Sequence, residues 1–311
     1  MKKKQAIIEV HALTKRYGDL TAVDRVTFSV FKGEVFAFLG PNGAGKTTTL
    51  EILQGLRRPT SGTASVLGFD VTSSKELGEI RKRIGVLPQE FSALDKLTVR
   101  ENVALFASMY ESSRDPDELI ELLDLSDKAD VRFDRLSGGL KQKVGIAASL
   151  VNDPEVVFLD EPTTGLDPRS RRAVWNVIDS LRKSGTTIVL TTHYMEEAER
   201  LADRIAIIHR GKISALGTAS DLINRYGGNT YIELEDVRQG LLDMIRRRFP
   251  SALIDGESLL IPVVETSQVL ETIGELVKMS ITGGIRVRNP TIEDVFLSVV
   301  GGRITEEGEV A

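Results

Sequence analysis

The hydrophobic pattern of this 311-residue chain changes between two periods. Short, continuously apolar runs predict strands buried on both faces of a sheet, at residues 35–39, 84–87, 156–159 and 187–191. Stretches with apolar residues three and four positions apart separate these runs and predict amphipathic helices, as over 169–182. The alternation of strands and helices predicts an α/β fold with a mainly parallel sheet.

Two segments depart from this alternation. Residues 6–13 and 26–30 alternate apolar and polar side chains, which predicts an antiparallel β layer with one solvated face. From about residue 98 to residue 149 the spacing of apolar residues is helical instead, with polar or glycine-rich breaks at Ser112–Pro116 and Leu136–Gly139. We therefore expect an inserted helical subdomain over about 98–149.

A domain boundary is predicted near residues 224–229, where two glycines lie in a polar stretch. It gives a first domain over 1–225 and a small C-terminal α+β domain over 226–311. In the second domain the predicted order is strand, helix, strand, strand, helix, strand, followed by a helix over 291–300. That order is typical of a split, ferredoxin-like unit.

Composition narrows the classes of function. The chain has 40 Lys and Arg against 45 Asp and Glu, a net charge of −5, which argues against a nucleic-acid partner bound through bulk charge. It contains no cysteine, which excludes disulfides and cysteine-ligated zinc. No apolar run approaches the ~18 residues of a membrane span, and Met1–Lys4 begin a segment too polar for a signal peptide. We therefore expect any role at a membrane to depend on a partner.

The residues after the first buried strand match the pattern G-x-x-x-x-G-K-T at every fixed position. They read Gly40-Pro41-Asn42-Gly43-Ala44-Gly45-Lys46-Thr47-Thr48 and lead into a predicted helix. The glycines let successive backbone amides point at one place, and the helix adds its N-terminal amides and dipole. Lys46 is expected to reach the outer phosphates and the Thr47 hydroxyl to ligate Mg²⁺. The stretch predicts binding of a nucleoside triphosphate.

Two carboxylates end a later buried strand. Asp160 is placed where a carboxylate that holds Mg²⁺ is needed, and Glu161 is placed to orient or deprotonate an attacking water. These residues and the phosphate loop leave several classes open, namely a GTPase, a kinase, a helicase or a transport ATPase.

The stretch Leu136-Ser137-Gly138-Gly139 decides among these classes. Together with the phosphate loop and Asp160-Glu161, it resembles the signature of the nucleotide-binding domains of ABC transporters, and the resemblance covers about residues 5–220. Further elements follow the family order: Gln89 at the Q-loop, Gly165-Leu166-Asp167-Pro168 at the D-loop and His193 at the H-loop. Tyr17, which alone indicates an ordinary half-exposed ring, falls where the family has its adenine-stacking aromatic.

The resemblance implies an ATPase whose two subunits meet head to tail, so that each ATP lies between one phosphate loop and the opposite signature. Catalysis is then assigned to Lys46, Gln89, Glu161 and His193, and the metal, Mg²⁺, to Thr47, Gln89 and Asp160. The residues expected to contact ATP are Tyr17, Asn42, Gly43, Ala44, Gly45, Lys46, Thr47, Thr48, Gln89, Ser137, Gly138, Gly139 and Asp167.

One residue departs from the common family pattern and indicates a particular branch of the family. After the signature glycines the family commonly has Gln, whereas this chain has Leu140, which resembles the drug-resistance and sodium-efflux branch that works with ABC-2-type permeases. The stretch Asn289–Leu297 resembles the ending of those subunits. This implies export through a separate membrane permease, a second nucleotide-binding subunit, and a cytoplasmic location on the inner face of the cell membrane. A soluble ABC-type ATPase acting on a ribosome or nucleic-acid complex is the alternative. The sequence does not identify the transported substrate.

Overall fold

The computed structural model describes residues 5–235, 239–255, 258–263, 266–279, 281, 284–302, 304–305 and 308–310. They form two compact units, the first made of residues up to 219 together with those from 302 onward, and the second of residues 220–301. The sequence instead predicted a boundary after 225 and assigned all of 226–311 to the second domain. The helix α8 (Ala219–Tyr226) spans the expected boundary, and the chain returns to the first unit at Gly302.

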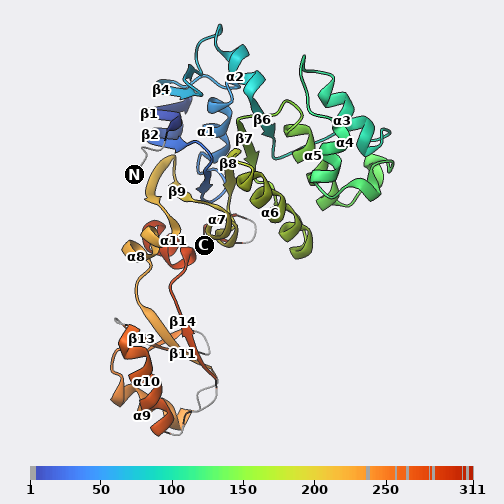
Figure 1. Ribbon diagram of the computed structural model, residues 1–311. Coiled ribbons are helices and arrows are strands. Elements are labelled where there is room, and N and C mark those ends of the chain that lie inside the picture. Colours follow the sequence, from blue (N-terminus) through green and yellow to red (C-terminus); the bar gives the residue numbers. More distant parts are fainter. Residues whose placement is uncertain are drawn as a thin grey trace. The chain divides into compact units, whose positions relative to one another are not determined.

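A six-stranded sheet runs through the first unit in the order β10-β9-β3-β8-β7-β6 (Figure 1). Its strands from β9 to β6 are parallel, and β10 is antiparallel to β9. Every residue of β3, β7 and β8 is buried, which is why the chain is continuously apolar there. The strands are β3 (Val35–Leu39), β6 (Ile84–Leu87), β7 (Val156–Asp160), β8 (Thr187–Thr192), β9 (Arg204–His209) and β10 (Lys212–Gly217).

The predicted antiparallel layer is confirmed as a second sheet, in the order β2-β1-β4-β5. Its strands extend further than the alternating pattern indicated, because β1 and β2 stay paired as far as Tyr17 and Leu20. Phe28 of this layer packs against Phe36 and Phe38 of β3, with ring centroids 5.1 to 5.5 Å apart. The strands are β1 (Ala6–Tyr17), β2 (Leu20–Phe31), β4 (Ser61–Val66) and β5 (Phe69–Asp70).

The helices of the first unit divide into two sets (Figure 1). In the first set, α1 (Lys46–Leu53) leads from the central sheet to the antiparallel layer and α2 (Leu77–Arg83) leads back. The other two, α6 (Pro168–Lys183) and α7 (Met195–Leu201), connect successive strands of the central sheet. Those that fall between β6 and β7 are α3 (Val99–Ala107), α4 (Pro116–Leu122) and α5 (Gly138–Ser149), with 3₁₀ turns at Ser126–Lys128 and Phe133–Arg135. The second set occupies the segment predicted to be a helical insertion.

The second unit is built on an antiparallel sheet in the order β12-β13-β11-β14, the strand order of a split, ferredoxin-like unit. Its core contains Ile232, Leu259, Ile261 and Leu276. Residues 237 and 238 of the predicted first helix lie outside the described residues. The elements are β11 (Thr230–Leu234), α9 (Gln239–Arg248), β12 (Leu253–Asp255), β13 (Ser258–Val263), α10 (Thr266–Lys278), β14 (Ile285–Arg288) and α11 (Ile292–Val300).

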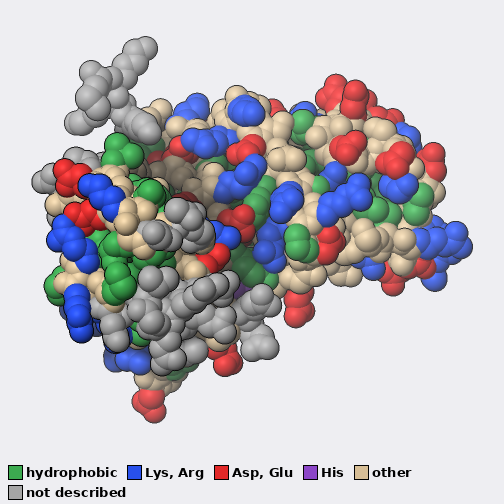
Figure 2. All heavy atoms as spheres, turned by 90° about the horizontal axis from the view of Figure 1, so that it is seen from below, with side chains coloured by type: hydrophobic (Ala, Val, Ile, Leu, Met, Phe, Trp, Pro, Cys, Tyr) green, Lys and Arg blue, Asp and Glu red, His purple; other side chains and the backbone are tan. Residues whose placement is uncertain are grey.

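The stretch Asn289–Leu297 includes the start of α11 and the residues that cap it. Thr291 and Asp294 form a reciprocal capping box at the start of this helix, and Ile292, Val295 and Phe296 are buried. Among the described residues, no helix is both long and apolar enough to cross a membrane. Figure 2 shows basic and acidic side chains interspersed over the visible face, as expected of a chain with a modest net charge.

Candidate functional site

The loop between β3 and α1 follows a path that only small residues permit. A Cβ atom on Gly40 would lie 2.2 Å from the carbonyl oxygen of Ile208, and one on Gly45 would lie 2.3 Å from that of Ala22. Gly45 precedes α1 with a φ of 103°, and neither a capping side chain nor an acidic residue occupies the first turn of this helix. The N-terminal amides and positive dipole end of α1 are therefore suited to an anion such as phosphate.

Asp160 and Thr47 meet at the carboxyl end of the parallel strands. Asp160 ends β7, and its Oδ1 accepts a hydrogen bond from Thr47 Oγ1 at 3.2 Å. Thr191, at the end of the neighbouring β8, donates a second hydroxyl to the same oxygen. Burial raises the pKa of Asp160, whereas the two hydroxyl donors act in the opposite direction. The structure thus brings together two of the three side chains assigned to Mg²⁺ from the sequence.

Lys46, Glu161 and His193 are linked through two buried side-chain contacts of Glu161. Lys46 Nζ lies 3.2 Å from Glu161 Oε1 and donates to the carbonyl oxygens of Gly40 and Pro41 at 2.7 and 3.1 Å. His193 Nδ1 lies 3.1 Å from Glu161 Oε2. Burial opposes ionisation of Glu161, but the bond to His193 and the charge of Lys46 outweigh it and lower the pKa of this carboxyl to about 2. Glu161 is therefore an anion held between two partners.

The far ring nitrogen of His193 has no partner. Its Nδ1 is engaged by Glu161, while Nε2 is buried without a hydrogen bond in the described structure. A buried polar atom without a partner costs about 1–3 kcal/mol, which a ligand oxygen at this position would offset. The neighbouring backbone is also fixed, because Glu161 has a φ of 48° and its amide donates to Thr191 O and Oγ1.

Glu197 is a further buried carboxylate near this cluster, and the sequence analysis did not identify it. Its Oε1 accepts from Thr163 Oγ1 and from Trp175 Nε1, both at 2.8 Å. It is completely buried in α7, and burial raises the pKa of its carboxyl. The contacts tie the loop after Glu161 to α6 and α7. A carboxylate on the apolar side of a short helix was the signal that could have identified it.

The predicted signature lies at the start of α5. Ser137 is its N-cap residue and, like Gly138, is exposed, whereas Gly139 is buried. A Cβ on Gly139 would lie 2.6 Å from both Cβ and Oγ of Ser170 in α6, so glycine allows the two helices to touch. Asp167 is the N-cap of α6 and accepts from the Ser170 amide at 3.1 Å and its hydroxyl at 2.6 Å.

The remaining predicted residues lie apart from this cluster. Tyr17 is 39% exposed at the end of β1, and its ring is flanked by Lys15 Nζ and the Arg57 guanidinium at 5.0 and 5.7 Å from the ring centroid. Gln89 follows β6, is exposed, and makes no hydrogen bond to any described residue. Ser137 likewise has no hydrogen bond or ion pair to the phosphate loop within the described part of its own chain.

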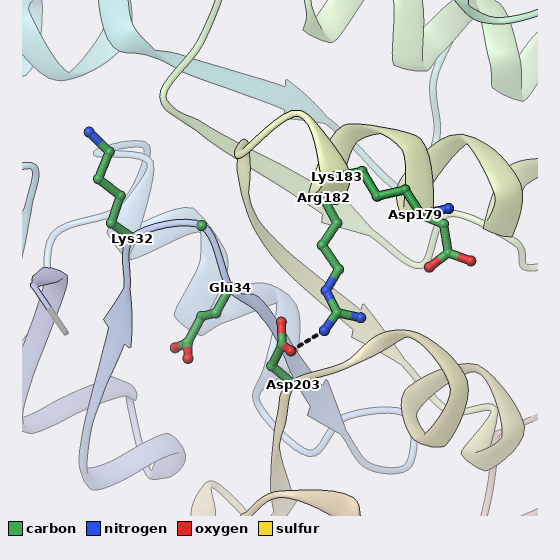
Figure 3. Close-up of a pocket in the computed structure, with 7 residues that line it drawn as sticks. Lys32, Glu34, Asp179, Arg182, Lys183 and Asp203 are labelled. Carbon is green, nitrogen blue, oxygen red and sulfur yellow. Dashed lines mark hydrogen bonds and ion pairs between the residues drawn. The ribbon is translucent and has the colours of Figure 1, made fainter. Parts of the chain in front are cut away.

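A charged cavity of about 300 Å³ lies at the opposite end of β3 (Figure 3). Its acidic groups are already engaged, since Asp203 accepts from Arg182 and from the Val35 amide, and Glu34 accepts from the Phe31 amide. The two bonds of Asp203 hold the N-terminal end of β3, the residue before β9 and the C-terminal end of α6 together. The cavity is lined by Lys32, Gly33, Glu34, Asp179, Arg182, Lys183 and Asp203.

Comparison with known proteins gives consistent results. A family model described as ABC transporter matches residues 23–164. The chain is 38% identical over 305 residues to the daunorubicin resistance ATP-binding protein DrrA3 of Streptomyces coeruleorubidus, covering 94% of this chain and 96% of that protein. It is 40% identical over 303 residues to the Nod factor export ATP-binding protein I of Rhizobium sp. (strain N33), covering 94% and 97%. The linearmycin resistance ATP-binding protein LnrL of Bacillus subtilis (strain 168) is 34% identical over 311 residues, covering 95% and 98%.

Solved structures of ATP-binding cassettes resemble about two thirds of the chain. A dimeric post-hydrolysis state of the ATP-binding cassette MJ0796 bound to ADP and Pi superposes with a TM-score of 0.61 at 28% identity, covering 68% of this chain and 98% of that one. An ATP-binding subunit of an ABC transporter gives a TM-score of 0.62 at 31% identity, covering 71% and 93%.

Proposed function

The chain belongs to the ATP-binding subunits of ABC transporters, and from this membership we propose that it hydrolyses ATP to power export of a small substrate through a separate permease. The observation that carries the proposal is the meeting of Lys46, Asp160, Glu161 and His193 beside the phosphate loop. Relatives named for drug resistance and Nod factor export favour export over a soluble role at a ribosome or nucleic acid.

Lys46, Glu161 and His193 each have a distinct part in hydrolysis. The amides from Asn42 to Thr48 hold the phosphates, and Lys46 turns from Glu161 to the outer phosphates as they arrive. Its departure leaves the Glu161 carboxylate to orient the attacking water. His193 Nε2 donates to the γ-phosphate, while its Nδ1 stays on Glu161. This arrangement positions the reactants and neutralises charge, which is most of what phosphoryl transfer requires.

The donor set near the phosphate loop also fits Mg²⁺. The Thr47 hydroxyl and the Asp160 carboxylate are already within 3.2 Å of each other, and Mg²⁺ prefers one or two carboxylates together with waters and phosphate oxygens. We assign these two side chains to the metal, with Gln89 as the third. The ion supplies positive charge that neutralises the phosphates.

The signature residues serve a second subunit. Ser137 and Gly138 are exposed at the start of a helix and, among the described residues, make no hydrogen bond to the phosphate loop. Their amides are therefore available to the γ-phosphate bound by a facing subunit, and the complete site requires a dimer. Asp167 contributes across the interface while its carboxylate remains the cap of α6.

An apolar cleft beside Gln89 supports the permease partner. The cleft has a volume of about 570 Å³, and its lining includes Phe91, Phe106, Met109 and Tyr110. We propose that a cytoplasmic segment of the permease docks here, which holds the subunit at the inner face of the membrane. Leu140 and the stretch Asn289–Leu297 favour a permease of the ABC-2 type.

Replacement of Glu161 tests the hydrolytic site. We expect Glu161→Gln to lower ATPase activity at least ~10²-fold and to accumulate an ATP-stabilised dimer on size exclusion. Glu155→Gln is the matched control, because the Glu155 side chain is exposed and pairs with Arg83 at the surface. Unchanged hydrolysis without a dimer would contradict both the catalytic and the two-subunit assignments.

The permease assignment has its own test. When the chain is expressed with and without the six-span apolar protein expected from a neighbouring gene, it should sediment with membranes only in the first case. Met109→Glu should abolish this association, whereas Met244→Glu, at an exposed methionine of the second unit, should not. Association with ribosomes in the absence of a permease would instead support the alternative function.

A further inference from the structure

The C-terminal residues of the first unit form a small hairpin. The Gly308 amide donates to Thr305 O at 2.9 Å, the Thr305 amide donates to Glu309 O at 2.8 Å, and Ile304 and Val310 form an antiparallel bridge. Gly308 has a φ of 83°, a left-handed conformation that glycine adopts without strain. We call the described residues 304, 305 and 308–310 the C-terminal hairpin.

The C-terminal hairpin contacts the phosphate loop. The carbonyl oxygen of Gly308 accepts a hydrogen bond from the Asn42 amide at 2.6 Å, and Gly308 itself is buried. A Cβ atom on Gly308 would lie 2.6 Å from Asn42 Nδ2 and 2.8 Å from Asn42 Cγ. Glycine is therefore required both by the turn and by the closeness of this contact.

We propose that the C-terminal hairpin is an internal competitor of nucleotide at the phosphate loop. A peptide carbonyl oxygen takes the Asn42 amide, which belongs to the same row of donors that holds phosphate oxygens in the proposed function. One amide cannot donate fully to both acceptors, so ATP must displace the hairpin. A hairpin on the loop also occupies surface that the signature of a facing subunit needs to reach.

The size of the effect follows from the net strength of one backbone hydrogen bond between neutral groups. Such a bond favours the docked form about fivefold, and the apparent affinity of a ligand falls with the fraction of protein that is competent to bind it. Removal of the hairpin is therefore expected to tighten nucleotide binding about fivefold. It should also lower the ATP concentration at which the Glu161→Gln variant forms its dimer.

The first experiment measures binding of a non-hydrolysable ATP analogue by calorimetry. Gly308→Ala and a chain that ends at Gly302 should both bind about fivefold more tightly than the full chain. Gly68→Ala is the matched control, because Gly68 has a φ of 85° and open space around it. Equal binding by the full and shortened chains would overturn the hairpin proposal alone, whereas no binding by any of them would overturn the proposed function.

The second experiment tests the contact itself, since the chain has no native cysteine. A Cβ on residue 308 lies 2.8 Å from Asn42 Cγ, where the sulfur of a cysteine at position 42 would lie. Gly308→Cys should loosen the hairpin as Gly308→Ala does, but oxidation traps the transient contact. We therefore expect Asn42→Cys combined with Gly308→Cys to form an intramolecular disulfide, to lose at least tenfold in nucleotide affinity when oxidised, and to recover on reduction. Saturating nucleotide should slow the cross-link. A cross-link that forms at the same rate with and without nucleotide would overturn the competition.

Discussion

The closest packing between α5 and α6 gives the sharpest test of why the signature contains glycine. A Cβ at position 139 would lie 2.6 Å from Cβ and Oγ of Ser170, and Ser170 Cβ is fixed to a helix, so the helices must separate. Overpacking of this kind costs about 1–3 kcal/mol, and we expect about 2 kcal/mol for Gly139→Ala.

The cost should depend on the partner side chain. In a Ser170→Gly background, which removes the opposing Cβ, Gly139→Ala should cost less than ~1 kcal/mol, whereas Ser170→Ala keeps that atom and should give no relief. Urea unfolding followed by fluorescence of Trp175, the single tryptophan of the chain, measures these differences. An equal cost in all three backgrounds would refute the packing argument. If the Ser170→Gly pair recovers stability but not ATPase activity, Gly139 also acts on the facing nucleotide.

Three further predictions concern the nucleotide site. Glu161→Gln should tighten binding of a non-hydrolysable ATP analogue about tenfold, because it frees Lys46 to bind the phosphates. At 3.2 Å the gross attraction between Lys46 and Glu161 is about 5 kcal/mol at an effective dielectric constant near 20. Glu155→Gln should leave binding unchanged. The pKa of Glu161 is lowered from 4.5 to about 2, so its ionisation contributes roughly 3 kcal/mol to the free energy of unfolding. This contribution is complete above pH 4.5 and disappears as the pH falls toward 2. Thermal melts of the native chain and Glu161→Gln should therefore converge in acid. Tyr17→Ala should weaken ATP binding about tenfold through lost stacking while Tyr17→Phe binds normally, as read by calorimetry; equal loss in both would refute a stacking role.

The fold was largely predictable because its signals are local. Continuous apolar runs identified β3, β7 and β8, since strands covered on both faces have no polar positions. The split order of the second unit was also predictable from alternating periods. The bounds of β1 were not, because none of its last four residues is buried and the segment is held by pairing with β2.

The candidate site was predictable where chemistry requires particular residue types in sequence, as in the phosphate loop and Asp160-Glu161. Contacts between distant segments were not. Three hydrogen bonds join residues that are far apart in the chain. They link Thr191 to Asp160, Thr163 to Glu197, and Asn42 to Gly308. No local period encodes such pairs, and a threonine or a glycine in isolation has many structural explanations.

The left-handed backbone at Glu161 has a consequence for how this protein can evolve. A non-glycine residue with a φ of 48° costs on the order of 1–3 kcal/mol, so glycine at this position would relax the chain. The contacts of Glu161 with Lys46 and His193 offset this cost, because removal of the carboxylate would leave the buried Lys46 ammonium without its partner. A stability screen of variants at neutral pH should therefore not recover Glu161→Gly, although glycine suits the backbone. The strained conformation is thus retained by the buried charge pair that the same carboxylate forms.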